Sequence, residues 1–552
     1  LAASAPQRVL YSPSLWCSSP ITANNQIDQI IYIFGEVISP STMSTIYKTP
    51  GVYIEEKNAF PNSVVALETA LPVFIGYTEM AFRNGKSVLD MPIKINSFAE
   101  YETIFGKKFQ AQFTIVDADS NLQQDTFDIE GTLKVLQRNE NNTGYLYDSM
   151  KLFYANGGGT CYILSIGTYG VKNDTTGEIR HESFQMKMED FIGTDTKEGP
   201  FEVLKRELEP TLLVMPDAIA LGEVCYNQIY TKALLHCAEM QHRMVILDLI
   251  NPSSAADSAG IVQAFRDQIG MQGLSYGAAY YPWLHTSMIA LNEVSFENLD
   301  ASVDLENVLP LTELAAMDLV KKFKDTVDPD IKAKQQFYQQ LTAVSPTYAT
   351  IMEKILHALN QLPPSGAIAG LYTMIDNSRG VWKAPANVSM NGVIGLSLMI
   401  SNHEQESLNI DVNTGKSINA IRQFTGKGFL VWGARTLDGN SQEWRYINVR
   451  RTVMMIEQSL KLAFRPYVFE PNVSSTWASV KSMITNFLTD LWKQGALVGS
   501  KPEHAFFVNI GLGITMNAQD ILDGRMILVV GVAMARPAEF IIISVEQQIQ
   551  QS

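Results

Sequence analysis

The residues that could act as catalysts or metal ligands are scattered along the sequence. The histidines number seven: His181, His236, His242, His285, His357, His403 and His504. Two of them, His236 and His242, are six residues apart, which places them on different faces of a helix, so no zinc pair is expected. The sequence contains no HExxH, GxSxG or Walker motif. We therefore predict that the protein is not an enzyme and has no catalytic residue, metal site or cofactor.

A run of three glycines at residues 157–159 could suggest a phosphate-binding loop. Such a loop lies between a strand and a following helix and carries a Lys-Ser/Thr pair. Here the pattern predicts a helix at residues 149–156, then the glycines, then a strand at residues 161–166. The glycines are therefore expected to end a helix. An α/β enzyme that binds a nucleotide or sugar phosphate at this loop remains the alternative function.

Two acidic residues, Asp217 and Asp248, directly follow predicted strands. Strands at residues 212–215, 244–248 and 276–284, with a helix at residues 224–240, indicate a parallel α/β arrangement. Enzymes of this type keep catalytic groups at such strand ends. Neither aspartate has a glycine-rich fingerprint nearby, so we expect both to cap helices.

Length and composition restrict the class of protein. The chain has 552 residues, 46% hydrophobic and 18% charged, which indicates an ordered protein of several domains. Its formal net charge of −15 argues against binding to nucleic acid or to an anionic membrane. No apolar run reaches 18 residues, so no membrane insertion is expected. Four cysteines without CxxC spacing indicate reduced thiols: Cys17, Cys161, Cys225 and Cys237.

The C-terminal third gathers glycine, tryptophan and arginine in separated motifs. It begins with Gly366-Ala-Ile-Ala-Gly370 and ends with Arg536-Pro-Ala-Glu539-Phe540. The motif residues between and within these ends are Trp382, Pro385, Trp432, Arg435, Trp444, Arg445, Arg450, Arg451, Arg536 and Glu539. Arginine forks suit carboxylates, so we expect an assembly surface that meets acidic patches on neighbouring copies. A well-packed domain with a solvated basic face is the alternative.

These motifs, in this order, resemble the sheath subunit of contractile phage tails and of phage-tail-like injection systems. Residues 49–56, Thr-Pro-Gly-Val-Tyr-Ile-Glu-Glu, resemble the N-terminal signature of the same family. The resemblance covers residues 45–106 and 149–552. It implies a mixed α/β, multi-domain subunit: an inner domain built from both termini, an inserted outer α/β domain, and extended terminal β-arms.

The expected domain boundaries follow from this resemblance and from composition. Residues 1–42 are expected to be a non-native or disordered extension, with an added arm that includes a strand at residues 29–38 as the alternative. Residues 43–66 form the N-terminal arm and part of the inner domain. Residues 67–362 form the outer domain, with polar insertions near residues 107–148 and 168–209. Residues 363–539 complete the inner domain, and residues 540–552 form the C-terminal arm.

The resemblance also implies the mechanism and the partners. The arms, which contain Tyr47, Val52, Tyr53 and Ile54 at one end and Phe540, Ile541, Ile542, Ile543 and Val545 at the other, would complete the sheets of neighbouring subunits. Stacked six-fold rings would surround an inner tube protein and contract to drive it through a target envelope. Further expected partners are baseplate and terminal cap proteins and sheath paralogues. Assembly is expected in the bacterial cytoplasm, within a particle that is either released or anchored to the membrane.

Overall fold

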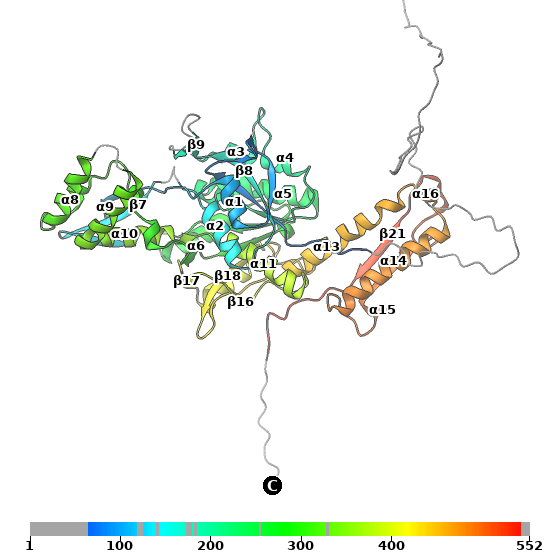
Figure 1. Ribbon diagram of the computed structural model, residues 1–552. Coiled ribbons are helices and arrows are strands. Elements are labelled where there is room, and N and C mark those ends of the chain that lie inside the picture. Colours follow the sequence, from blue (N-terminus) through cyan, green and yellow to red (C-terminus); the bar gives the residue numbers. More distant parts are fainter. Residues whose placement is uncertain are drawn as a thin grey trace, which may run out of the picture. The chain divides into compact units, whose positions relative to one another are not determined.

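The computed structural model describes residues 64–118, 125–139, 143–172, 179–181, 185–252, 255–326 and 330–542, and Figure 1 shows how their helices and strands are arranged. The extension expected at residues 1–42 and the N-terminal arm residues Tyr47, Val52, Tyr53 and Ile54 lie outside these ranges.

A nine-stranded sheet organises most of the described chain. Its strand order is β16-β19-β18-β13-β12-β11-β1-β8-β4. The bounds are β1 (Pro72–Thr78), β4 (Pro92–Ile95), β8 (Cys161–Thr168), β11 (Leu212–Val214), β12 (Met244–Asp248), β13 (Gly277–Tyr281), β16 (Val388–Ser389), β18 (Ile418–Phe424) and β19 (Gly428–Val431). The six strands from β18 to β8 are parallel, and the strands at both edges are antiparallel. The predicted parallel α/β arrangement is confirmed.

The boundary expected at residue 363 passes through this sheet. Strand β18 pairs with β13 in register, Ala279 opposite Ile418, although the two strands lie on opposite sides of that boundary. Side chains from both sides, such as Val73 and Ile421, also share one hydrophobic core, which we call the main core. Residues 388–431 therefore belong to the sheet of the expected outer domain, because they cover the edge of β13.

Six helices pack around this sheet: α1 (Phe98–Phe105), α2 (Leu146–Ala155), α5 (Thr231–Met240), α6 (Ser258–Gln268), α11 (Ser365–Arg379) and α12 (Asn402–Asn409). Helices α2 and α11 approach closely, which explains the Gly366-to-Gly370 motif. A Cβ on Gly366 would lie 2.5 Å from the carbonyl oxygen of Ser149, and one on Gly370 2.5 Å from that of Phe153. Only glycine permits this approach of two backbones.

The polar insertion at residues 107–148 and the helices at residues 285–362 fold together as an insertion module with its own core. The module contains β5 (Phe113–Asp117), β6 (Thr126–Ile129), β7 (Thr132–Arg138), α7 (Leu305–Val308), α8 (Leu314–Lys324), α9 (Ile331–Val344) and α10 (Pro346–Leu359). The strands form a three-stranded sheet of order β5-β7-β6. Phe113 and Phe127 pack with Tyr348 and Ile351 from the helices.

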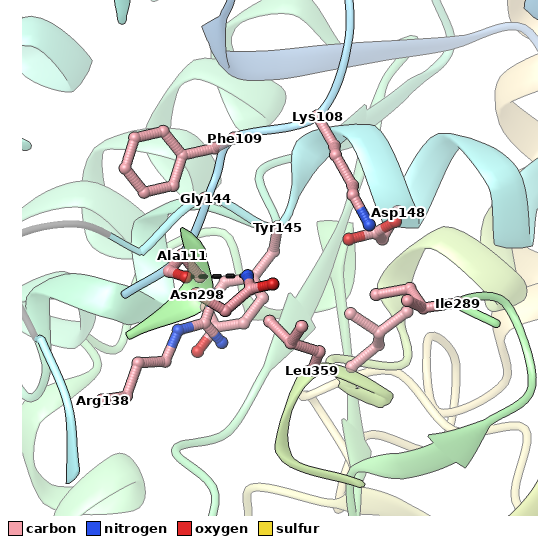
Figure 2. Close-up of a pocket in the computed structure, with 11 residues that line it drawn as sticks. Lys108, Phe109, Ala111, Arg138, Gly144, Tyr145, Asp148, Ile289, Asn298 and Leu359 are labelled. Carbon is pink, nitrogen blue, oxygen red and sulfur yellow. Dashed lines mark hydrogen bonds between the residues drawn. The ribbon is translucent and has the colours of Figure 1, made fainter. Parts of the chain in front are cut away.

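A small cavity lies where the insertion module meets helix α2. Figure 2 shows Lys108 and Asp148 directed toward each other and Asn298 close to Ala111. The side chain of Asn298 donates a hydrogen bond to the Ala111 carbonyl oxygen, 3.0 Å away, and so joins the two stretches of the module. Burial raises the pKa of the Asp148 carboxyl, although Lys108 and Lys151 lower it.

The remaining elements include a second helical unit near the C-terminus. It contains α13 (Ile447–Ala463), α14 (Ser474–Lys493), α15 (Pro502–Ala505), β20 (Phe506–Ile510), α16 (Ala518–Leu522) and β21 (Leu528–Val532). Smaller elements are β2 (Phe82–Arg83), β3 (Lys86–Ser87), β9 (Gly170–Lys172), β10 (Ile179–His181), α3 (Met188–Ile192), α4 (Pro200–Leu204), β14 (Leu284–Thr286), β15 (Gln361–Leu362) and β17 (Val393–Leu396). In the described chain, no helix is long and apolar enough to cross a membrane.

Candidate functional site: the roots of the chain ends on helix α13

Helix α13 joins the main core to a separate C-terminal core. Ile447 and Met454 are buried in the main core, whereas Met455, Ile456 and Leu460 pack with α14 and with strands β20 and β21. The helix contains neither glycine nor proline, so nothing in its sequence interrupts the hydrogen-bond ladder between the two cores.

The C-terminal end of the chain is held at the start of α13 by a buried ion pair, which we call the C-terminal root. Arg435 and Glu539 form a bidentate contact: Nε lies 2.9 Å from Oε1, and Nη2 lies 2.5 Å from Oε2. The hydroxyl of Tyr446, at the N-cap of α13, donates to the same carboxylate over 3.3 Å. Two residues further on, Asn448 donates to the Ala535 carbonyl oxygen at 3.0 Å. Residues 535–539 are therefore fixed to their own subunit.

The N-terminal side of the described chain is held farther along the same helix, at what we call the N-terminal root. The backbone N–H of Leu67 donates to Ser459 Oγ over 3.2 Å, and Arg451 Nη2 donates to the Thr69 carbonyl oxygen over 3.0 Å. Arg451 also makes a bidentate pair with Asp376 of α11, at 3.0 and 2.6 Å. In Figure 1 the blue segment that starts the described chain lies alongside α13.

The expectation that the motif arginines form an exposed assembly surface is wrong for three of them. Arg435, Arg450 and Arg451 are buried and have partners within the chain. The Arg450 guanidinium lies between the rings of Tyr276 and Trp444, 3.9 and 4.4 Å from their centres. Of the motif arginines, Arg536 is the exposed one, and Arg445 is half-buried with its Nε donating to the Gly439 carbonyl oxygen.

The tryptophans of the motifs serve different packing roles. Trp382 is partly buried against the C-terminal core, and its carbonyl oxygen accepts a hydrogen bond from Asn448. Pro385 is buried close by in the chain. Trp432 is exposed and lies against the ring of Phe424, 4.3 Å between centres. The sequence motifs do not show that Trp382 shares the partner residue Asn448 with the C-terminal root.

Beyond Glu539 the chain presents bare apolar side chains. Phe540, Ile541 and Ile542 are 70%, 80% and 89% exposed and lie in no strand. The other predicted residues of the C-terminal arm, Ile543 and Val545, lie outside the described ranges. In isolation such a segment is an aggregation hazard, so a partner must cover it.

A two-stranded sheet in the C-terminal core has room for such a partner. Strands β20 and β21 pair antiparallel from Phe506 opposite Val532 to Ile510 opposite Leu528. Among the described residues neither strand pairs with a third named strand, and the isolated bridge between Leu497 and Met534 lies just beyond the end of β21. An open edge offers a row of backbone N–H and C=O groups to an extended segment. Local sequence pattern does not show that these two strands pair with each other and with no third strand among the described residues.

The other candidate residues have structural roles. The glycines at residues 157–159 follow the end of α2: Gly157 has a φ of 91°, and Gly158 N–H donates to the Phe153 carbonyl oxygen. The predicted helix stop is confirmed, and the phosphate loop is wrong because no helix begins there. Within the described ranges, no group of three or more His, Cys, Asp or Glu side chains could hold a metal ion.

Both candidate aspartates cap helices, as predicted, but the helices are distant in sequence. Asp217 Oδ1 accepts the N–H groups of Tyr145 and Leu146 at the start of α2, at 2.6 and 2.9 Å. Asp248 Oδ1 accepts the N–H of Ser365 at the start of α11, at 2.8 Å. Burial raises the pKa of Asp217 to about 6 and that of Asp248 to about 7.

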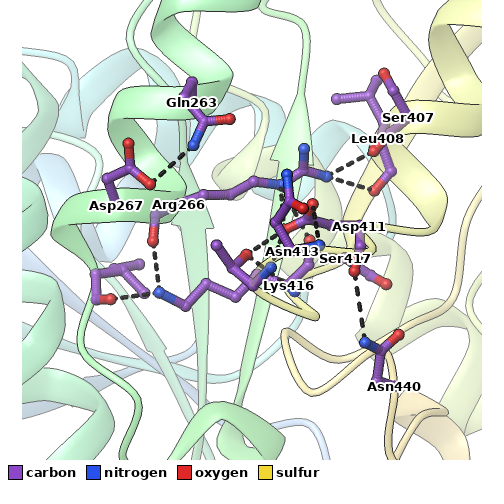
Figure 3. Close-up of polar contacts among 12 residues, drawn as sticks. Gln263, Arg266, Asp267, Ser407, Leu408, Asp411, Asn413, Lys416, Ser417 and Asn440 are labelled. Atoms are coloured by element: carbon purple, nitrogen blue, oxygen red, sulfur yellow. Dashed lines mark hydrogen bonds and ion pairs between the residues drawn. The ribbon is translucent and has the colours of Figure 1, made fainter.

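A further buried polar cluster fixes β18 to helix α6 (Figure 3). Lys416 Nζ donates to the carbonyl oxygens of Arg266 and Ile269 at the end of α6, at 2.5 and 2.6 Å. The Arg266 guanidinium in turn lies 3.6 Å from the Asp411 carboxylate. Burial lowers the pKa of both cations. These groups neutralise one another or occupy helix carbonyls, so the cluster has a structural role.

Comparisons with known proteins agree with this architecture. Family models match residues 316–437, as the phage tail sheath protein central domain, and residues 440–548, as the phage tail sheath C-terminal domain. The tail sheath protein of Vibrio phage KVP40 is 27% identical over 161 residues, which are 28% of this chain and 24% of that protein. The chain therefore matches only about a quarter of the length of that relative.

Similar solved structures cover almost the whole chain. The PVC sheath complex of an extracellular contractile injection system, in its contracted state, is 28% identical with a TM-score of 0.55, covering 92% of this chain and 99% of that one. A chain of the six-fold symmetrised baseplate of the anti-feeding prophage is 28% identical with a TM-score of 0.53, covering 91% and 100%. These matches define the class as sheath proteins of phage tails and phage-tail-like particles. The chain is similar to contractile tail sheath proteins in its C-terminal sequence and in its fold.

Proposed function

We propose that the protein is the structural sheath subunit of a contractile injection apparatus. Copies polymerise as stacked helical rings around an inner tube protein, and the polymer contracts to drive that tube through a target envelope. The observation that carries the proposal is the exposed apolar segment at residues 540–542, which follows the fixed root at Glu539. Since β20 and β21 pair with no third strand in the described part of the chain, residues 540–546 of one copy can add a strand to the next.

Strand addition between copies explains why a polymer forms. Such a contact joins unlike surfaces, so it repeats head to tail and gives rings or open helices. The N-terminal arm, residues 47–56, would supply a second strand. The rooted arms would keep copies connected while their bodies rotate, and the free energy for contraction would come from repacked interfaces, on the order of a few kcal/mol for each copy. No nucleotide is needed.

The expected partners are further copies of this chain, an inner tube protein, baseplate and terminal cap proteins, and sheath paralogues. The two neighbours described above come from a sheath complex and a baseplate, which supports the first and third of these. Assembly in the bacterial cytoplasm, before the particle is released or anchored, is part of the same proposal.

Removal of residues 540–552 tests the proposal. The purified full chain should form striated tubes in negative-stain micrographs, without hydrolysing ATP. The truncated chain should remain a folded monomer, because the Arg435–Glu539 pair and the residues before it are retained. A less drastic variant replaces Phe540 and Ile542 with serine.

The matched control replaces Ile514 and Leu522 with serine, two exposed apolar residues of the same C-terminal unit outside the arm. These changes remove similar apolar area but leave the arm intact, so tubes should form normally. Normal tubes from the truncated chain would refute the strand addition, and ATP turnover with nucleotide binding by a small oligomer would favour an enzyme.

A further inference from the structure

Both chain ends of the subunit are rooted on one helix. Tyr446 and Asn448 of α13 contact the C-terminal root, and Arg451 and Ser459 contact the N-terminal root. Asn448 and Ser459 are 11 residues apart, about 16 Å at the rise of an α-helix. The covalent path between the same two roots passes through the whole nine-stranded sheet and the insertion module.

The side-chain contacts give α13 a stiff connection to each root. The C-terminal root has a bidentate ion pair, and the N-terminal root is held by the Arg451 fork, which also pairs with Asp376. Thr69 reinforces this root, because its hydroxyl donates to the Asp376 carboxylate over 2.5 Å. All these side chains are buried or nearly so, which strengthens their charge-assisted hydrogen bonds.

We infer that α13 carries tension between the two arms. A pull on one arm passes through its root into the helix, along its backbone ladder and out through the other root. The insertion module lies off this path, whereas Ile447 and Met454 of α13 are buried in the main core, so helix and main sheet can rotate as one body during contraction without separating neighbouring copies. This inference rests on the proposed function, because it requires arms that are held by neighbouring subunits.

The geometry predicts links in series. The helix, the C-terminal root and the N-terminal root follow one another along the path, so breaking either root interrupts it completely. A chain of copies with both roots weakened should therefore break about as easily as a chain with the weaker root alone. If the two roots lay on independent paths, the increases in breakage rate caused by weakening each root would instead multiply.

The test shears purified polymers in graded steps and measures their lengths by electron microscopy. Glu539→Gln removes the charge at the C-terminal root, and Arg451→Lys keeps a cation for Asp376 but loses the fork that also reaches Thr69. Each variant should raise the breakage rate about tenfold, as expected for a weakened charge-assisted hydrogen bond. Because the breakage rates of links in series add, the double variant should break at most about twice as fast as the faster-breaking single variant. Ser459→Ala serves as a milder N-terminal variant if Arg451→Lys fails to fold.

The matched control is Asp411→Asn, which weakens a similarly buried ion pair with Arg266 off the α13 path. It should lower the melting temperature and leave the breakage rate unchanged. Breakage unaffected by either root, equal breakage in the control, or multiplied effects in the double variant would each overturn the inference while polymers still form. If the unaltered chain forms no polymers, the proposed function itself fails.

Discussion

The ion pairs at the two roots differ in kind from those on the insertion module. At the roots, arginine meets a carboxylate through two parallel hydrogen bonds in a buried setting, as in Arg451–Asp376, whose side chains are both 4% exposed. On the module, lysine meets carboxylates at the surface, as in Lys324–Asp304, where the side chains are 47% and 40% exposed. Arginine is therefore used where geometry must be fixed, and lysine where the surface must stay solvated.

This contrast separates two ways in which charge stabilises the fold. A buried pair is costly to break, because the remaining charge has lost its hydration and its partner. An exposed pair contributes little, because water and salt replace the partner. The roots should therefore tolerate little change, and the module surface should tolerate much.

The largest effect is expected from Asp376→Ala. The change leaves the Arg451 guanidinium buried with only a carbonyl oxygen and the Tyr372 ring nearby. The free energy of unfolding should fall by about 3–5 kcal/mol. Urea denaturation followed by circular dichroism measures this loss. A decrease below 1 kcal/mol, the range for exposed pairs, would remove the distinction between the two regions.

A smaller effect, dependent on pH, is expected from Asp248. An unfolded aspartate titrates near pH 3.9, whereas burial raises the native pKa of Asp248 to about 7. The native state therefore binds this proton more tightly, and the resulting stability is present below about pH 4 and is lost as the pH rises to 7. Relative to Asp248→Asn, the unaltered chain should lose about 2–3 kcal/mol between pH 5 and 7.

The matched experiment uses Asp304 on the module. The hydrogen bond from Lys324 lowers its pKa, so its contribution is present above about pH 4 and is lost only as the pH falls further. The difference in free energy of unfolding between Asp304→Asn and the unaltered chain should therefore be the same at pH 5, 6 and 7. If the difference between Asp248→Asn and the unaltered chain were also independent of pH, burial at the start of α11 would not govern the titration of Asp248.

The smallest effect is expected from Lys324→Ala on the module surface. The ammonium lies 2.7 Å from Asp304 and 3.4 Å from Glu306, but all three groups are exposed to solvent. The free energy of unfolding should change only slightly, and the difference should shrink further in 1 M salt. Thermal unfolding at low and high salt provides the measurement. A loss comparable to that of Asp376→Ala would contradict the comparison.

The sequence predicted the parts of this structure that depend on local pattern. The glycines at residues 157–159 end α2 as expected, since Gly157 has a φ of 91° and Gly158 N–H donates to the Phe153 carbonyl oxygen. The roles of Asp217 and Asp248 were also predicted in kind. The partners were not, because each aspartate caps a helix far away in the chain, and no local pattern encodes that contact.

The same limit explains the errors. Spacing alone does not distinguish an arginine that meets a neighbouring copy from one that meets Glu539, 104 residues away in the same chain. Nor does composition show that residues 388–431 extend the main sheet, because an edge strand and an inner strand of a second domain have similar patterns. Both the partner of Arg435 and the place of residues 388–431 in the main sheet depend on contacts between residues that are far apart in the sequence.

The insertion module has a consequence for how such subunits diversify. Its strands come from one stretch of the chain and its helices from another, about 150 residues further on, yet they share one apolar interior. Neither stretch alone buries Phe113, Phe127 and Tyr348. A subunit that acquired only one of the two stretches would therefore expose apolar surface to water. Transfer of this appendage between relatives therefore requires two coordinated exchanges of gene segments, which favours inheriting it whole or losing it whole.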